Sequence, residues 1–307
     1  MDKKHTGVSH LLSRFRGWIQ AGATLLTNLH LPNFFKGGLY QGTGKTVCVP
    51  GLNCYSCPAA SGACPIGAFQ AVVGSSKFSF SYYITGFLIL LGVLLGRFIC
   101  GFLCPFGWFQ ELLHKIPTKK LSTKKLKPLT YLKYAVLLVM VFLLPAFLVN
   151  DVGMGDPFFC KYLCPQGVLE GAIPLSLANS GIRAALGSLF TWKFGILLAV
   201  IVLSVVFYRP FCKWLCPLGA FYALLNKVSL FQMKVDQNKC VSCGKCTRAC
   251  KMDVDVTKAP NHTECIRCGM CIRACPTDAI RFRYGFGEGK DTEKTEKAVP
   301  APQNNTQ

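Results

Sequence analysis

The sequence predicts an all-α membrane protein with about four transmembrane helices, joined to a cytoplasmic module that resembles a two-cluster bacterial ferredoxin. Three observations lead to this prediction. The mean hydropathy is +0.36 over 307 residues, which is high for a soluble domain. A short cysteine–proline motif occurs four times along the apolar part of the chain. Eight of the 18 cysteines have the spacing that holds two iron–sulfur clusters.

Several apolar stretches approach the length needed to cross a membrane. A bilayer core of roughly 30 Å requires about 20 helical residues. We expect spans at Trp18–Phe35, at Tyr82–Ile99, at Tyr131–Val149 and in a stretch centred on Phe194–Tyr208. The N-terminus is basic, but no cleavage pattern follows its apolar part, so we interpret this segment as an uncleaved first span.

The positive charges are distributed unevenly and indicate a membrane topology. The net charge is +20, and lysines crowd the N-terminus and the loop at 115–133, whereas the stretch 149–190 holds only Lys161 and Arg183. The positive-inside rule places the N-terminus and the lysine-rich loop in the cytoplasm. No aromatic and basic reading surface accompanies the charge, so we expect contact with membrane lipid and not with nucleic acid. The expected location is a prokaryotic plasma membrane, crossed several times, with both termini cytoplasmic.

The cysteine–proline motif, here called the CP motif, occurs at 64–70, 104–110, 164–170 and 216–222. Its proline is suited to starting a helical turn, and its glycine lets backbone amides approach sulfur closely. Three copies carry a second cysteine four residues earlier, a spacing that shares one face of a helix. These pairs are Cys100/Cys104, Cys160/Cys164 and Cys212/Cys216. In the first copy, Cys64 is preceded instead by Cys54 and Cys57.

Alternating spans group these cysteines into two metal sites, one near each membrane face. Four thiolates meet at the cytoplasmic boundary, from Cys100, Cys104, Cys212 and Cys216. On the outer side, Cys160 and Cys164 meet Cys64 and either Cys54 or Cys57. Four thiolates suit a two-iron or a four-iron centre. The outer side has more cysteines than one such centre needs, and Cys48 is left without an assigned role.

The strongest metal-binding signal lies near the C-terminus. Two runs with C-x2-C-x2-C-x3-C spacing begin at Cys240 and Cys265, and in such runs the fourth cysteine binds the cluster of the other run. Zinc modules usually have a longer spacer and often histidine, so iron–sulfur clusters are favoured. We therefore predict one [4Fe–4S] cluster on Cys240, Cys243, Cys246 and Cys275, and a second on Cys265, Cys268, Cys271 and Cys250.

Composition divides the chain into four regions. Residues 1–75 hold the first span and an outer cysteine-rich loop, and residues 76–230 form the membrane domain with the CP motifs. Residues 231–284 form the ferredoxin-like module, with strand-like flanks at Gln232–Val235 and Ala279–Arg283. The polar stretch 285–307 is expected to be disordered.

The motif RFICGFLCPFGWFQE at 97–111, repeated as PFCKWLCPLGAFY at 210–222 and followed by a two-cluster module, resembles the polyferredoxin-type membrane proteins. This family comprises the NapH-like quinol dehydrogenases and the C-terminal part of NosR-like proteins. The resemblance covers most of residues 80–283. It implies a four-span fold, cytoplasmic clusters and electron exchange with quinones or with redox partners outside the cytoplasm.

These features favour a membrane-bound protein that relays electrons from a cytoplasmic donor, a ferredoxin or a flavoprotein, to an outer flavin or haem protein. The first alternative is a quinol dehydrogenase subunit that feeds an extracytoplasmic reductase. The second is a redox-sensing or copper-handling regulator, because soft thiolates suit copper(I). No nucleophile, base or substrate pocket is recognisable in the sequence. We therefore expect an electron-transfer component of an oxidoreductase system without a catalytic site of its own.

Overall fold

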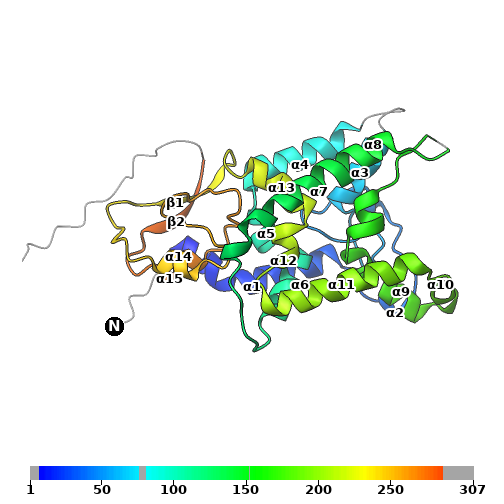
Figure 1. The fold of residues 1–307 in the computed structure, drawn as a ribbon, viewed down its shortest axis with the longest axis horizontal. Coiled ribbons are helices and arrows are strands. Elements are labelled where there is room, and N and C mark those ends of the chain that lie inside the picture. Colours follow the sequence, from blue (N-terminus) through cyan, green and yellow to red (C-terminus); the bar gives the residue numbers. More distant parts are fainter. Residues whose placement is uncertain (1–6, 76–80, 152, 286–307) are drawn as a thin grey trace, which may run out of the picture.

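Helices dominate the computed structural model, which describes residues 7–75, 81–151 and 153–285. A bundle of helices forms the larger part, and a small cysteine-rich module with two strands lies at one end of it (Figure 1). The predicted disordered tail falls almost entirely outside the described residues. The elements up to the lysine-rich loop are α1 (Val8–Thr27), α2 (Asn33–Lys36), η1 (Thr43–Thr46), α3 (Pro65–Gly74), α4 (Tyr82–Leu95), α5 (Phe98–Phe102) and α6 (Pro105–His114).

The second half of the bundle contains the longer apolar helices. Its elements are η2 (Lys124–Tyr131), α7 (Leu132–Val136), η3 (Leu137–Leu143), α8 (Leu144–Phe147), η4 (Phe159–Leu163), η5 (Gly167–Ala172), α9 (Ile173–Ala178), α10 (Ser180–Ala184), α11 (Ser188–Val206), α12 (Pro210–Trp214) and α13 (Pro217–Leu225). The module contains β1 (Phe231–Val235), α14 (Lys245–Ala249), α15 (Met270–Ala274) and β2 (Ile280–Tyr284).

Within the described ranges, two helical stretches are long and apolar enough to cross a membrane, Lys124–Phe147 and Ser188–Val206. They overlap the predicted third and fourth spans. The second predicted span is divided, because α4 ends after 14 residues and Gly96 adopts a φ of +55°. A side chain at Gly96 would meet Arg267 Nη1 at 2.6 Å, so the close approach of the module requires glycine at this break.

The position predicted for the first span, Trp18–Phe35, is wrong at both ends. Helix α1 begins at Val8 and ends at Thr27, where the backbone of Asn28 leaves helical geometry. The hydropathy pattern missed the start of α1 because polar residues on one face of the helix are buried. Arg16 Nε and Gln20 Nε2 both donate to the carbonyl oxygen of Gly101, at 2.9 and 3.0 Å. These bonds anchor α1 to α5.

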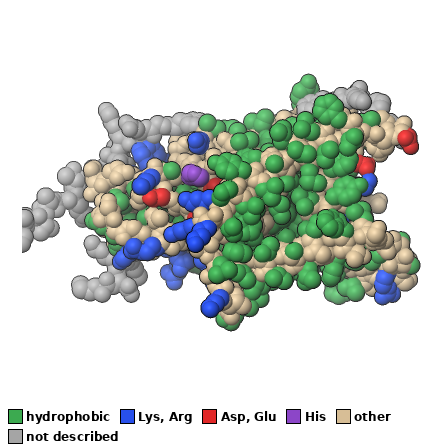
Figure 2. Space-filling model, in the orientation of Figure 1, with side chains coloured by type: hydrophobic (Ala, Val, Ile, Leu, Met, Phe, Trp, Pro, Cys, Tyr) green, Lys and Arg blue, Asp and Glu red, His purple; other side chains and the backbone are tan. Residues whose placement is uncertain are grey.

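The two parts of the molecule differ in the chemistry of their surfaces. On the face shown in Figure 2, hydrophobic side chains cover most of the bundle, and lysine and arginine gather over the module and its junction with the bundle. Leu138, Leu198 and Val202 are each more than half exposed, at 58%, 53% and 57%. Exposed side chains of this kind on long helices suit an apolar surrounding better than water.

In the module, β1 pairs antiparallel with β2, from Phe231 opposite Tyr284 to Val235 opposite Ile280. The strand-like flanks predicted from the sequence are therefore confirmed to within one residue at each end. The short helices α14 and α15 follow Gly244 and Gly269, which have φ values of 68° and 76°. The pair of strands closes the module around the cysteine runs.

Candidate metal centres

Three of the four CP motifs place their cysteine immediately before a new helix. Cys64, Cys104 and Cys216 are the N-cap residues of α3, α6 and α13, and proline occupies the first turn of each helix. Proline is favoured at this position because its missing N–H would have no partner there. The prediction that paired cysteines share one helix is therefore wrong. Cys100 lies in α5, and the helix ends before Cys104 starts α6.

The glycine of each CP motif brings a backbone amide to the preceding cysteine, as predicted. Gly219 N donates to Cys216 Sγ at 3.4 Å. The corresponding glycines, Gly67, Gly107 and Gly167, hydrogen-bond Cys64, Cys104 and Cys164. A helix N-terminus carries a partial positive charge, which stabilises a thiolate next to it. Cys64, Cys104 and Cys216 thus lie where a helix N-terminus favours the thiolate, whereas Cys164 lies three residues before η5. Burial of these thiols opposes their ionisation.

The structure brings together two of the cysteine pairs to form what we call the inner site. The Cys216 thiol interacts electrostatically with Cys212, Cys100 and Cys104. All four cysteines are buried, with exposures between 6% and 8%. This is the grouping predicted from the alternation of the spans.

Two arginines flank the inner site, and the sequence analysis missed both. Arg97 and Arg209 each lie three residues before a cysteine pair and are fully buried. Each reaches the CP glycine of the opposite motif: a Cβ at Gly107 would lie 2.9 Å from Arg209 Nη1, and one at Gly219 would lie 3.6 Å from Arg97 Nη2. Within the described chain, Nη2 of both arginines has no hydrogen-bond partner. Buried donors beside four thiols fit the sulfur acceptors of a negatively charged iron–sulfur cluster.

A buried carboxylate holds Arg209 in place. Glu111 Oε1 lies 2.9 Å from Arg209 Nε and also contacts Arg16 and the hydroxyl of Tyr208. Burial would raise the pKa of Glu111, but the two guanidinium groups outweigh it and lower that pKa to about 2. Glu111 is therefore ionised throughout the neutral range and compensates part of the arginine charge.

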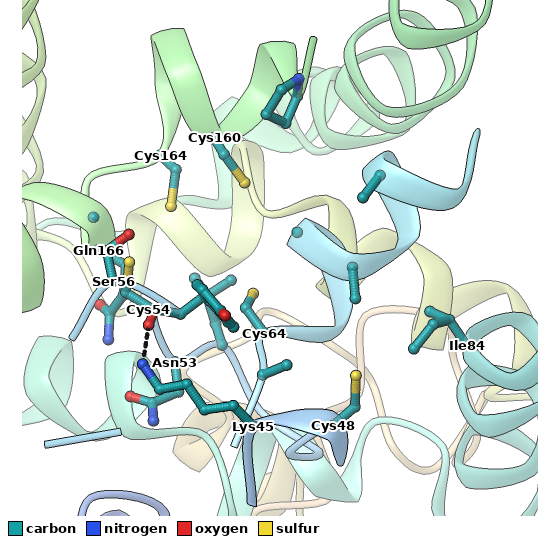
Figure 3. A pocket seen from close by; sticks show the side chains of 18 of the residues that line it. Lys45, Cys48, Asn53, Cys54, Ser56, Cys64, Ile84, Cys160, Cys164 and Gln166 are labelled. Atoms are coloured by element: carbon teal, nitrogen blue, oxygen red, sulfur yellow. Dashed lines mark hydrogen bonds between the residues drawn. The ribbon is translucent and has the colours of Figure 1, made fainter. Parts of the chain in front are cut away.

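The remaining CP cysteines, Cys64 and Cys164, line a cavity of about 520 Å³ together with Cys54 and Cys160, and we call this cavity the outer site. Cys54, Cys64, Cys160 and Cys164 point their sulfur atoms toward a common space, and Cys48 lies to one side (Figure 3). The thiol of Cys160 interacts electrostatically with those of the other three. The backbone carbonyl of Cys160 also accepts a hydrogen bond from Lys193 Nζ at 2.9 Å.

The structure distinguishes between the two alternatives for the fourth outer cysteine. Cys54 lines the cavity, whereas Cys57 does not. Cys57 packs instead with Ala59, Ala60 and Phe34. Its sulfur lies 3.6 Å from Asn28 Oδ1. The spacing of Cys54 and Cys57 in the sequence could not reveal this difference, because it depends on how the loop packs against the end of α1.

The module contains two further cysteine groups, arranged as the crossed spacing predicts. Cys240, Cys243, Cys246 and Cys275 line one cavity of about 210 Å³, here the first module site. The second module site contains Cys271, which interacts electrostatically with Cys268, Cys265 and Cys250. Burial raises the pKa of the Cys265 thiol to about 12, so a positively charged partner is needed to hold its thiolate form.

Among the residues that the structure describes, no group of three or more His, Cys, Asp or Glu side chains is close enough to hold one metal ion. Zinc would draw sulfur ligands to about 2.3 Å from the metal. Cysteines that line cavities, each next to backbone or arginine donors, fit iron–sulfur clusters better.

The second module site lies directly against the inner site. A Cβ at Gly101, between the two cysteines of the first inner pair, would lie 2.3 Å from the carbonyl oxygen of Ile266. Ile266 in turn follows Cys265 of the second module site. Three groups fasten this contact. Arg267 Nη1 donates to Leu95 O at 2.9 Å, and Asn226 Nδ2 donates to Cys265 O at 3.1 Å. Glu264 pairs with the buried Arg97 at 3.0 Å and contacts Lys133.

The inner and outer sites are connected by one short segment, 50–54. A Cβ at Gly51 would lie 2.8 Å from Cys104 Cα. The next two backbone amides act on different sites: the amide of Leu52 favours the thiolate form of Cys104, and the amide of Asn53 favours that of Cys64. Tyr222 is fully buried between the sites, interacts electrostatically with thiols of both, and donates to Pro50 O at 3.1 Å. The second module site, the inner site and the outer site therefore follow one another in series.

A helical bundle with buried cysteine sites and an attached two-site module defines the class of ferredoxin-type iron–sulfur proteins. One 4Fe–4S binding domain family matches residues 62–82, 79–124, 133–173 and 189–236, and a second 4Fe–4S binding domain family matches residues 259–281. The chain belongs to the polyferredoxin-like family, as the resemblance of its motifs predicted.

Three relatives show how far the similarity extends along the chain. An uncharacterized protein of Methanocaldococcus jannaschii is 32% identical over 65% of this chain and 77% of its own length. The methylamine utilization ferredoxin-type protein MauN of Methylorubrum extorquens is 27% identical over 65% of this chain and 59% of its own length. The ferredoxin-type protein NapH of Haemophilus influenzae is 28% identical over 36% of this chain and 52% of its own length. The chain thus spans only between half and three fifths of the latter two relatives. No solved structure matches the chain.

Proposed function

We propose that this iron–sulfur protein carries electrons across a membrane through four clusters held in series. The observation that carries the proposal is the contact that joins the second module site to the inner site and the inner site to the outer site. The loop of the second module site touches Gly101 of the inner site, and consecutive amides at Leu52 and Asn53 join the inner and outer sites. A cluster held by four thiolates supplies a one-electron carrier, and such carriers need close neighbours.

Four cysteines would hold each cluster. We assign the module clusters as the crossed spacing predicts, with Cys250 and Cys275 exchanged between the runs. The inner cluster would be held by Cys100, Cys104, Cys212 and Cys216, and the outer cluster by Cys54, Cys64, Cys160 and Cys164. The buried thiols, the helix N-termini and the partnerless N–H groups of Arg97 and Arg209 support these assignments.

The membrane placement rests on where charge and apolar surface lie. We propose that α1, α4, the helix 124–147 and α11 embed the bundle, with the module in the cytoplasm. The lysine-rich loop supports this orientation, since Lys133 contacts Glu264 of the module. The start of α1 lies at the same end, where Ser9 Oγ accepts from Phe282 N at 3.0 Å. Positive charge concentrated at one end of an apolar bundle is typical of the cytoplasmic side.

The two ends of the cluster series indicate where the electron donor and the electron acceptor would bind. We propose a cytoplasmic ferredoxin or flavoprotein as the donor at the first module site. At the other end, the 520 Å³ cavity of the outer site would pass electrons to a flavin or haem protein outside the cytoplasm. The function therefore resembles that of an electron-transfer subunit and not of an enzyme acting alone.

Transfer across vesicles tests this function. The full chain is reconstituted into phospholipid vesicles that contain ferricyanide, and dithionite-reduced ferredoxin is added outside. We expect ferricyanide to be reduced by the unmodified chain and not by Cys104→Ser or Cys164→Ser. Equal rates for all three proteins would refute transfer through the membrane sites. Reduction that occurs only when a quinone is added to the lipid would favour the quinol dehydrogenase alternative instead.

A further inference from the structure

The sixth residue after the CP cysteine reaches across to a partner segment in all four copies of the motif. It is Gln70 and Gln110 in the first two copies, and Glu170 and Tyr222 in the last two. Glu170 accepts from Cys54 N at 2.9 Å, and Tyr222 donates to Pro50 O. The two glutamines differ from Glu170 and Tyr222 because each donates a hydrogen bond to a cysteine sulfur. Both glutamines are completely buried.

The side-chain amide of Gln110 has a fixed orientation at the inner site. Its oxygen accepts from Phe211 N at 3.2 Å. Its nitrogen lies 3.1 Å from Cys212 Sγ and 3.3 Å from Phe106 O, so both N–H groups have an acceptor. Reversing the amide would set its oxygen against a carbonyl and a sulfur and leave Phe211 N without an acceptor. The N–H donor must therefore face Cys212.

Gln70 has the same arrangement at the outer site. Its oxygen accepts from Phe159 N at 2.9 Å, and its nitrogen lies 3.2 Å from Cys160 Sγ and 3.3 Å from Ile66 O. In both sites the glutamine comes from one CP motif, and it bonds the first cysteine of the opposite pair and the amide just before that cysteine. Two independent copies of one geometry indicate a shared role that goes beyond filling space.

We infer that Gln110 and Gln70 are positioning residues that set the reduction potentials of the inner and outer clusters, respectively. This inference rests on the proposed cluster assignments. A reduced cluster carries one more negative charge than an oxidised one, and that charge is spread partly over its cysteine sulfurs. An N–H donated to such a sulfur stabilises the reduced form more than the oxidised form, so it raises the potential.

A purely structural role makes a different prediction. If the glutamines only tie α6 to α12 and α3 to η4, their loss weakens the fold but does not change one cluster selectively. The inference instead requires that each glutamine acts on a single cluster. The two sites therefore serve as controls for each other within one protein.

The test is a redox titration of the full-length chain, followed by electron paramagnetic resonance, on Gln110→Met and Gln70→Met. Methionine has a similar length and no donor. We expect Gln110→Met to shift the oxidised-to-reduced ratio of the inner cluster about tenfold at fixed potential, a fall of about 59 mV for a one-electron couple. Gln70→Met should do the same to the outer cluster alone. In the unmodified chain, deuterium exchange should remove one exchangeable proton coupling from each cluster signal, and the matching variant should lack that coupling before exchange.

Two further variants complete the design. Gln110→Glu keeps an acceptor for Phe211 N, and at a pH where the new carboxyl group is ionised it removes the donor. At that pH it should also lower the potential of the inner cluster if the methionine variant loses iron. Gln20→Met is the matched control, because Gln20 is buried nearby but donates to Gly101 O and not to sulfur. It should leave both potentials unchanged. Unmoved potentials in the Gln110 and Gln70 variants, or equal shifts of both clusters, would overturn the inference. Absence of both membrane signals from the unmodified chain would instead overturn the proposed function.

Discussion

The contact at Gly101 allows a direct test of how the module joins the bundle. In Gly101→Ala, the new methyl group would lie 2.3 Å from Ile266 O, whereas ordinary contact begins at 3.4 Å. One of the two backbones must therefore move by roughly 1 Å. The α5 backbone is held from the other side, because Gly101 O accepts from both Arg16 and Gln20. The loop of the second module site is thus the part that must retreat.

We expect this substitution to weaken docking of the module by about 1–3 kcal/mol, the usual cost of forcing a methyl group into a packed contact. Hydrogen–deuterium exchange of the intact protein measures it, through the exchange of the amides at 262–269. Those amides should exchange faster, by roughly fivefold to 150-fold for that range of energies. Electron transfer between the module and the inner cluster should slow as well.

Gly86→Ala is the matched control. Gly86 lies inside α4, and a Cβ there meets nothing within 4 Å. This variant should be neutral or slightly stabilising, by about 0.5–1 kcal/mol, because alanine is preferred to glycine within a helix. The reasoning is refuted if Gly101→Ala and Gly86→Ala give the same exchange rates at 262–269.

Two other predictions concern the module. Glu264→Gln removes the carboxylate from two buried cations, Arg97 and Lys133, so it should destabilise docking by about 3–5 kcal/mol and expose the module to proteolysis. The control is Asp236→Asn, which removes a partly exposed ion pair with Lys239 and should change stability by no more than about 1 kcal/mol. Similar proteolysis of Glu264→Gln and Asp236→Asn would contradict the role of Glu264. Cys250→Ser should alter the magnetic signal of the cluster on Cys265, Cys268 and Cys271 and spare that on Cys240, Cys243 and Cys246. Loss of the latter signal alone would show that the cysteine runs are not crossed.

Features that depend on short-range spacing were predictable from the sequence. The module cysteines group across the two runs as their spacing implies, and β1 and β2 lie where the flanking residues suggested. Three of the four CP motifs place proline in the first turn of a helix, and Gly219 donates its amide to sulfur, because these effects are local. The pairing of Cys100/Cys104 with Cys212/Cys216 also followed from alternating helices.

Features that depend on distant contacts were not predictable. Nothing in the sequence near Cys54 and Cys57 indicates that only Cys54 faces the outer cavity. The start of α1 was missed because its buried Arg16 and Gln20 look like surface residues until α5 is placed beside them. The charge compensation at the inner site is an intermediate case. Arg97 and Arg209 each stand three residues before a cysteine pair, and this repeated spacing is a signal from which a pair of buried cations could have been inferred.

The number of iron atoms bound to the full-length chain tests the central claim most directly. Four [4Fe–4S] clusters require about sixteen irons per chain after anaerobic preparation, and the module alone accounts for about eight. We predict that the unmodified chain contains close to the higher number, with matching sulfide. The double variant Cys104→Ser, Cys164→Ser should fall to about eight irons while the module signals persist. Equal iron in the two proteins would contradict the claim that the membrane cysteines hold clusters.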